Sequence, residues 1–108
     1  MLSQEEIKRL VKEAQSGQIQ AFDRLFDLLA DRFYRFFFLR VQDEEEARDL
    51  LHDLFLELWH SLPSFQFREN IPFTAWVYRI ARRMLSDFWR RQRKYRFFPL
   101  FPDNLYPL

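Results

Sequence analysis

Residues 73–94 read FTAWVYRIARRMLSDFWRRQRK, and the spacing of their apolar side chains decides the fold class. Apolar residues recur at steps of three and four, as on the buried face of an amphipathic α-helix: Phe73, Trp76, Val77, Ile80, Ala81, Met84, Leu85 and Phe88. The opposite face is polar and mostly basic: Arg79, Arg82, Arg83, Ser86, Arg90 and Arg93, with Tyr78 and Trp89 at its border. The stretch therefore predicts a helix that packs on a core and presents arginines to a polyanion.

The net charge of the chain is +1, but the charges are segregated along the sequence. Residues 73–96 contain eight Lys or Arg and one acid, Asp87, whereas residues 1–72 contain nine bases and fourteen acids. A basic helix with interleaved aromatic side chains is typical of nucleic-acid binding. A merely solvated basic face is the alternative, and the concentration of charge on one terminal helix favours nucleic acid.

The composition limits the class of protein. A chain of 108 residues that is 48% apolar, with 14 Phe and 3 Trp, is expected to form one globular domain rather than a disordered segment. Its single glycine argues against β-rich folds and against a glycine-rich phosphate loop. The absence of cysteine excludes disulfides and thiolate chemistry. The sequence shows no signal peptide and no apolar run long enough to span a membrane, so we expect a cytoplasmic protein.

The periodicity predicts an all-α fold, a compact bundle of four helices. The predicted helices lie near residues 3–16, 18–40, 44–62 and 73–95. Ser3 and Glu6 form a capping box at the start of the first helix, and Gly17 follows its last apolar position as a C-terminal cap. Residues 1–96 are expected to form the domain, and the proline-rich residues 97–108 an extended tail or the start of a linker.

The inner stripes of the four helices are expected to meet in one core: Leu25, Phe26, Phe33, Leu51, Phe55, Trp59, Trp76 and Ile80. The outward face of the third helix carries Asp49, His52 and Asp53 around one large apolar side chain, Leu56. A single exposed leucine is common in soluble proteins and indicates nothing by itself.

Catalytic and metal-binding patterns are weak. His52 and His60 lack nearby Ser, Cys or Asp partners with the geometry of a hydrolytic triad. Glu57 and His60 match one E-x-x-H element of a di-iron bundle, but such a site needs a second copy and two further glutamates. Asp49 and Asp53 could act in acid–base chemistry, although carboxylates on an outward helix face are usually only solvated. We therefore expect no enzyme activity, no metal site and no cofactor.

Three segments resemble region 2 of bacterial RNA polymerase sigma factors, of the extracytoplasmic-function (ECF) type of the sigma-70 family. They are AFDRLFDLLADRFYRFFFLR (21–40), DEEEARDLLHDLFLELWHSLPSF (43–65) and PFTAWVYRIARRMLSDFWRR (72–91). KEAQSGQIQAF, at 12–22, is similar to the usual opening of the family. The match covers roughly residues 7–94. It is specific because the D-L-x-x-D-x-F-L-x-L-W and P-F-x-x-W-V-Y-R-I-A-R runs keep the family's order and separation.

The resemblance implies a promoter-recognition domain that binds core RNA polymerase and the single-stranded −10 element to start transcription. In this family the third helix docks on the clamp helices of the largest polymerase subunit. Polymerase binding would then fall to Asp49, His52, Asp53 and Leu56. The fourth helix and the loop before it hold the −10 element, with one base turned out. The corresponding DNA-binding residues are Arg68, Glu69, Asn70, Tyr78, Arg79, Arg82, Arg83, Ser86 and Arg90.

The same resemblance makes an anti-sigma factor a further candidate partner, and it implies a cytoplasmic bacterial protein that reaches the nucleoid with the polymerase. Some positions depart from the family pattern. His52 stands where Gln is common, and Arg83 stands where Asn is usual. Residues 79–80 lack the paired tryptophans with which housekeeping sigma factors open the duplex. No second helix-turn-helix domain follows Arg96, as expected either of a fragment that ends after region 2 or of a naturally short protein.

Two other functions stay open at this stage. The first is an interaction-only module that binds the polymerase or an anti-sigma partner without productive DNA recognition, and the segregated charge speaks against it. The second is a repressor that reads double-stranded DNA with a helix-turn-helix. That motif needs a turn of about three or four residues between its helices. The loop at residues 63–72 is too long for such a turn.

Overall fold

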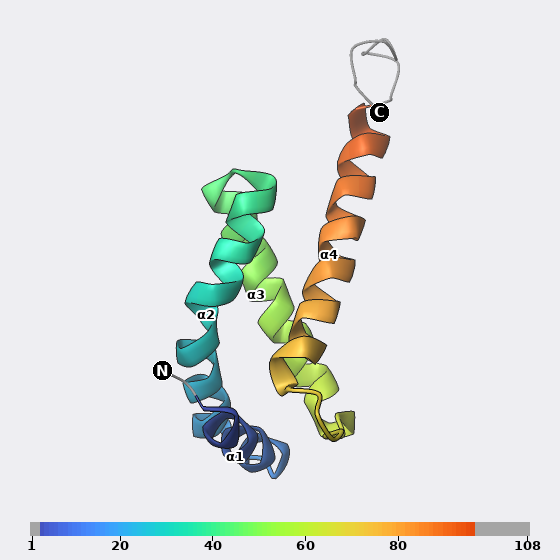
Figure 1. The fold of residues 1–108 in the computed structure, drawn as a ribbon. Helices are drawn as coiled ribbons and strands as arrows, with labels where there is room; N and C mark the ends of the chain where they lie inside the picture. The colour runs from blue at the N-terminus through green and yellow to red at the C-terminus, as the bar shows by residue number, and fades with distance from the viewer. Residues whose placement is uncertain (1–2, 97–108) are drawn as a thin grey trace.

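The computed structural model describes residues 3–96, and these residues form four α-helices and no named strand (Figure 1). The helices are α1 (Gln4–Gln15), α2 (Ile19–Val41), α3 (Glu44–Ser61) and α4 (Phe73–Arg96), and a short 3-10 turn, η1 (Leu62–Ser64), follows α3. The predicted all-α fold is confirmed, and every helix boundary lies within one residue of its predicted position. The predicted tail at residues 97–108 lies outside the described residues.

The helices pack as a small bundle in which α2 and α3 lie side by side with opposed chain directions (Figure 1). α4 follows the other side of α3, and α1 crosses the end of the bundle where α2 begins and α3 ends. α1 contacts α2, η1 and α4 there. None of the helices in residues 3–96 is both long and apolar enough to cross a membrane.

The local sequence explains where α1 begins and ends. The hydroxyl of Ser3 accepts a hydrogen bond of 3.1 Å from the backbone N–H three residues on, which caps the first turn. Gly17 has a φ of 98°, a left-handed conformation that glycine adopts without steric cost. Its N–H and that of Gln18 donate to the carbonyls of Ala14 and Glu13, which is the bond pair of a Schellman motif. The predicted caps at Ser3 and Gly17 are confirmed.

The tight turn between α2 and α3 also has a local cause. Gln42 ends α2 with a φ of 55° and donates its N–H to the Phe38 carbonyl at 2.7 Å. The Asp43 carboxylate then accepts a hydrogen bond of 2.9 Å from the N–H of Glu46 and caps α3. Acids in the first turn of α3 also interact favourably with the helix dipole. The turn therefore fixes the antiparallel packing of the two helices.

All four helices contribute side chains to one apolar core. Its largest fully buried members include Phe33 and Phe37 of α2, Leu54 and Leu58 of α3, and Val77 of α4. Seven of the eight predicted core residues lie in this core or pack against it: Leu25, Phe26, Phe33, Leu51, Phe55, Trp76 and Ile80. The phase of the stripes predicted for α2, α3 and α4 is therefore correct.

Trp59 is the exception, and its prediction as a core residue is wrong because 38% of it is exposed. It lies in the last turns of α3, where its ring packs edge-on against Phe22 with 5.0 Å between centroids. A hollow of about 310 Å³ lies beside the indole and is lined by Ala14, Leu62 and other residues from the ends of α1 and α3. The side chain points to the inner side as its spacing predicts, but no element covers so large a ring at the helix end.

Candidate nucleic-acid interface

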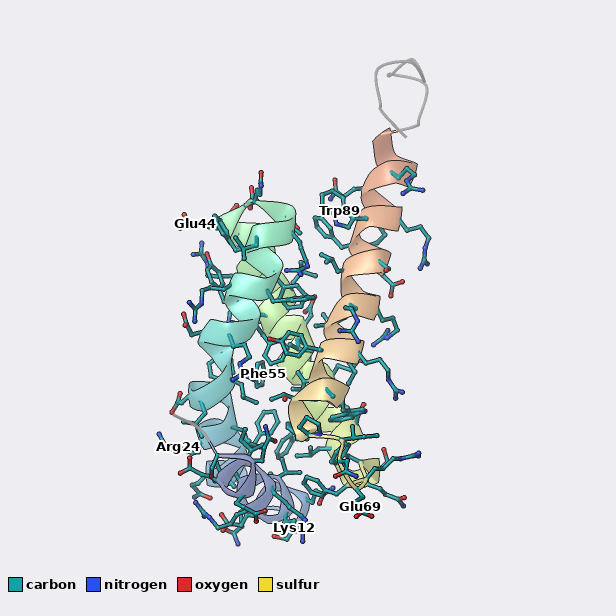
Figure 2. All side chains as sticks on the ribbon, in the orientation of Figure 1. Lys12, Arg24, Glu44, Phe55, Glu69 and Trp89 are labelled. Carbon is teal, nitrogen blue, oxygen red and sulfur yellow. The ribbon has the colours of Figure 1, made fainter. Side chains whose placement is uncertain are left out.

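α4 separates its apolar side chains from its basic ones. Its inner stripe is buried: Phe73, Val77, Ile80, Ala81, Met84 and Phe88. The residues predicted for its polar outer face are all exposed: Arg79, Arg82, Arg83, Ser86, Arg90 and Arg93, of which all but Arg93 are predicted DNA-binding residues. Side chains project from α4 away from the other helices over much of its length (Figure 2). The outer face is therefore accessible to a polyanion.

The loop before α4 and the start of α4 enclose an open hollow of about 460 Å³, which we call the loop hollow. Its lining residues are Ser64, Phe65, Gln66, Arg68, Ile71, Ala75, Trp76, Arg79 and Arg82. Three predicted DNA-binding arginines thus meet around one half-buried indole, that of Trp76. Within residues 3–96 none of these three arginines forms an ion pair. The hollow combines an aromatic surface with unneutralised positive charge.

Aromatic packing gives the loop its shape. The Phe65 ring lies 4.9 Å from Phe67, 5.2 Å from Phe73 and 4.6 Å from Trp76, measured between ring centroids. Two of these contacts join the loop to the first turn of α4, so the loop is anchored on the helix that it precedes. Two of these packed rings, those of Phe65 and Trp76, line the loop hollow and form the aromatic part of its wall.

The tip of the loop is a tight turn from Arg68 to Ile71, closed by an Ile71 N–H to Arg68 C=O hydrogen bond of 3.2 Å. Asn70 adopts a φ of 66° in this turn, a left-handed conformation that asparagine tolerates better than most residues. Asn70 therefore has a structural role in addition to any contact with DNA. The sequence pattern did not reveal this role, because the turn has neither glycine nor proline inside it.

The structure separates the predicted loop residues into two groups. Glu69 and Asn70 line a second hollow, of about 420 Å³, together with Lys8 and other residues of α1. They do not line the loop hollow, whereas Arg68 borders both. Base contacts from Glu69 and Asn70 would therefore be made on a different side of the loop from the loop hollow, whereas Arg68 could contact a base on either side.

Gln15, which the sequence did not single out, supports the loop from α1. Its side-chain amide donates hydrogen bonds to the Leu62 carbonyl at 3.0 Å and to the Phe65 carbonyl at 2.8 Å. The amide is partly buried, and Lys8 of the same helix lies over the Phe67 ring with its Nζ 5.4 Å from the centroid. α1 thus contacts the loop at two points. Only a long-range contact identifies such a residue, since Gln15 sits on no apolar or basic stripe.

Ion pairs engage the arginines farther along α4. Asp87 Oδ1 accepts a hydrogen bond of 2.6 Å from Arg90, and its Oδ2 lies 3.7 Å from Arg83 Nη1. Arg83 also forms an ion pair with Glu57 of α3. Two of the predicted DNA-binding arginines are therefore partly neutralised by neighbouring carboxylates, in contrast to those at the loop hollow.

Tyr78 lies apart from the exposed arginines. Its ring packs against α2, with centroids 4.4 Å from Phe33 and 5.4 Å from Phe36. The half-buried ring is part of the packing between α4 and α2, which leaves little of it for stacking with a base. Trp76 and Phe65 are the aromatic side chains that line the loop hollow instead. The helical spacing placed Tyr78 at the border of the basic face, and the inward tilt of its ring could not be predicted from that spacing.

The outer face of α3 carries the residues predicted to bind polymerase. Asp49, His52, Asp53 and Leu56 are all exposed. Leu56 is 60% exposed, although its neighbours Leu54 and Phe55 are buried. Within residues 3–96 no group of three His, Asp or Glu side chains gathers as a metal site. The face is a polar surface with one apolar side chain.

A model of the family described as Sigma-70 region 2 matches residues 25–95. The chain is 34% identical over 84 residues to the ECF RNA polymerase sigma factor BldN of Streptomyces coelicolor, a match that covers 78% of this chain and 31% of BldN. It is 28% identical over 87 residues to the ECF RNA polymerase sigma factor SigW of Bacillus subtilis, which covers 81% of this chain and 46% of SigW.

A third relative is the RNA polymerase sigma-H factor of Pseudomonas aeruginosa, 33% identical over 81 residues, with 75% of this chain and 41% of that protein covered. The chain thus spans less than half the length of these relatives. The residues that match the family include the outer face of α3, the loop and the basic face of α4. The chain belongs to the Sigma-70 region 2 family, and two of the three relatives above are sigma factors of the ECF type.

Proposed function

We propose that this chain is the promoter-recognition domain of an ECF-type sigma factor, which binds core RNA polymerase and holds the −10 element as a single strand. The observation that carries the proposal is the loop hollow. There Arg68, Arg79 and Arg82, all without ion-pair partners in the described part of the chain, surround the indole of Trp76. Basic grooves with aromatic platforms are the usual means of binding single-stranded nucleic acid.

The chemistry of binding follows from these groups. Arginines on the outer face of α4 attract the phosphates, and from residue 79 to residue 93 the helix offers about 21 Å of such surface, at about 1.5 Å per residue. A base turned into the loop hollow would contact the indole of Trp76, and stacking contributes roughly 1–3 kcal/mol per base. Turning a base out of a duplex costs about a few kcal/mol, so these contacts offset that cost. The domain captures melted DNA without catalysing a reaction.

The proposed polymerase contact is the outer face of α3. Leu56 is 60% exposed within a ring of polar side chains, Asp49, His52 and Asp53. One apolar side chain inside a polar ring fits a hole in a helical partner such as the clamp helices. This face and the basic face of α4 belong to different helices, so one domain can hold the polymerase and DNA together. The cytoplasm and the nucleoid are the locations that such a role requires.

A second candidate is a module that binds the polymerase or an anti-sigma factor without productive DNA recognition. The ion pairs of Asp87 and Glu57 favour it, since they neutralise part of the basic face in the free chain. Only the first function requires the arginines of the loop hollow to bind single-stranded DNA. Binding of single-stranded DNA decides between them.

The test compares two double variants that lose the same charge. Arg79→Ala/Arg82→Ala removes two arginines from the loop hollow, and Arg24→Ala/Arg32→Ala removes two exposed arginines from α2. Fluorescence anisotropy with a labelled single-stranded oligonucleotide should show weaker binding only for the first variant. Its salt dependence should be flatter by about 1.4 units of slope, at about 0.7 per lost phosphate contact. Equal behaviour of the two variants, or equal binding to any duplex, would rule out the proposed DNA contact.

A further inference from the structure

α4 contains one acidic residue, Asp87, and this residue lies between two arginines of the basic face. Its two carboxylate oxygens face different partners, Arg90 at 2.6 Å and Arg83 at 3.7 Å. Arg83 is shared with Glu57 of α3. The carboxylate of Asp87 thus occupies guanidinium N–H groups that phosphate oxygens of a bound strand would use.

Carboxylate and phosphate compete for the same donors on chemical grounds. Both present paired oxygens that match the planar fork of a guanidinium group. The pairs at Asp87 are partly solvated, with side-chain exposures of 34% for Asp87, 52% for Arg83 and 74% for Arg90. Ion pairs with this degree of exposure are weak, so a phosphate can displace Asp87 at small cost.

The basic face of α4 is consequently uneven in its free charge. Arg79 and Arg82, at the loop hollow, have no ion-pair partner within residues 3–96. Arg83, the residue after Arg82, and Arg90, about two turns farther along the helix, are both paired. A strand would therefore meet a weaker attraction around Asp87 than at the loop hollow, or than at the exposed Arg93, which also forms no ion pair within residues 3–96.

From this arrangement we infer that Asp87 is an intramolecular competitor for DNA phosphates and sets how much of the affinity comes from the backbone. The inference rests on the proposed function and names a residue that tunes it. The ligand in competition is the phosphodiester backbone of a single strand. By holding Arg83 and Arg90, Asp87 lowers sequence-independent attraction, so contacts at the loop hollow account for a larger share of the binding free energy.

The test is Asp87→Asn, with Asp31→Asn as its matched control. Asp31 forms an ion pair of 2.8 Å with Arg35 on α2, so its replacement changes the net charge equally and also frees one arginine, away from α4. At about 50 mM salt, Asp87→Asn should bind a single-stranded oligonucleotide about two- to tenfold more tightly than Asp31→Asn does. That range corresponds to one or two exposed ion pairs of ordinary strength. Equal affinities of the two variants would overturn the inference.

Two further measurements make the outcome specific. In a protein that already carries Arg83→Ala and Arg90→Ala, adding Asp87→Asn should no longer tighten binding of the oligonucleotide, since the freed guanidinium groups cause the gain. A gain that survives both changes would mean that Asp87 acts through its charge alone, and the inference would fail. The proposed function fails separately, if the unaltered chain itself shows no preference for single strands. Thermal melting of each variant checks that the fold is retained.

Discussion

Gln15 and Phe65, 50 residues apart in the chain, are joined by a hydrogen bond of 2.8 Å from the Gln15 amide to the Phe65 carbonyl. The same amide also donates to the Leu62 carbonyl at 3.0 Å. A helix that precedes the matched residues 25–95 therefore holds the loop that borders the loop hollow. The shape of this loop depends on α1 as well as on its own aromatic rings.

This contact can be tested with Gln15→Glu, which keeps the shape of the side chain but removes its donor. A carboxylate cannot donate to the two carbonyl oxygens, and the partly buried Phe65 carbonyl then loses its hydrogen bond from Gln15, a change that costs up to about 1–3 kcal/mol. For a domain of this size the melting temperature should fall by roughly 4–8 °C for each kcal/mol. Gln20→Glu, at an exposed position of α2, is the control and should melt close to the unaltered protein. Equal melting of the two variants would show that the hydrogen bonds contribute nothing.

Trp76 should report on the binding of single strands. In a Trp59→Phe/Trp89→Phe background Trp76 is the one remaining tryptophan, because the chain has 3. A base stacked in the loop hollow should quench its fluorescence as a single-stranded oligonucleotide is added. The matched reporter keeps Trp59 alone, which lines a different hollow and not the loop hollow, and its emission should change little. Equal quenching of both reporters would contradict a base site at Trp76.

Leu56→Asp should separate stability from polymerase binding. The side chain is 60% exposed, so the free energy of unfolding should change by only about 0.5 kcal/mol. An anchor at the centre of an interface typically contributes about 2 kcal/mol or more, so binding to core polymerase should weaken at least about thirtyfold. Leu39→Asp is the control, since Leu39 is 68% exposed at the end of α2. Retained polymerase binding by Leu56→Asp would show that this face of α3 is not the docking surface.

Gly17→Ala should isolate the cost of a left-handed residue. A Cβ at this position would meet no atom within 4 Å, so any loss of stability comes from the φ of 98° and not from a clash. A left-handed conformation costs an ordinary residue roughly 1–2 kcal/mol, and asparagine less. Denaturant unfolding should therefore rank stability as Gly17, then Gly17→Asn, then Gly17→Ala. An unchanged midpoint for Gly17→Ala would mean that the turn after α1 rearranges freely.

The sequence predicted the helices and most of the core because apolar spacing reports directly which face of a helix is buried. Leu56 and Leu54 illustrate this, since their positions in the period of α3 place one outside and the other inside. The prediction that Trp59 is a core residue was wrong because periodicity gives the direction of a side chain and not whether a neighbouring element covers it. Gln15 and Asp87 depend on contacts between or along helices, whose partners a one-dimensional pattern does not identify.

The candidate site also has features that the sequence predicted and features that depend on packing. Charge segregation predicted the exposed arginines of α4, and the structure adds that Arg79 and Arg82 share a hollow with Trp76. The orientation of Tyr78 toward Phe33 depends on how α4 packs against α2, which the sequence alone does not specify. The roles assigned to these residues in DNA binding remain predictions.

The alternation of buried and exposed side chains along α3 has a consequence for mutational scanning. Leu54, Phe55 and Leu58 face the core, while Asp53 and Leu56 face solvent. If the outer face docks on polymerase, substitutions at buried positions should lower the abundance of the protein, and substitutions at outer positions should lower the transcription that each molecule supports. The effect of each substitution on cellular abundance and its effect on transcription per molecule can be plotted against position in α3. The two plots should then both vary with the helical period, in opposite phase. Neither plot alone would separate a folding defect from a lost partner, but their phase difference would.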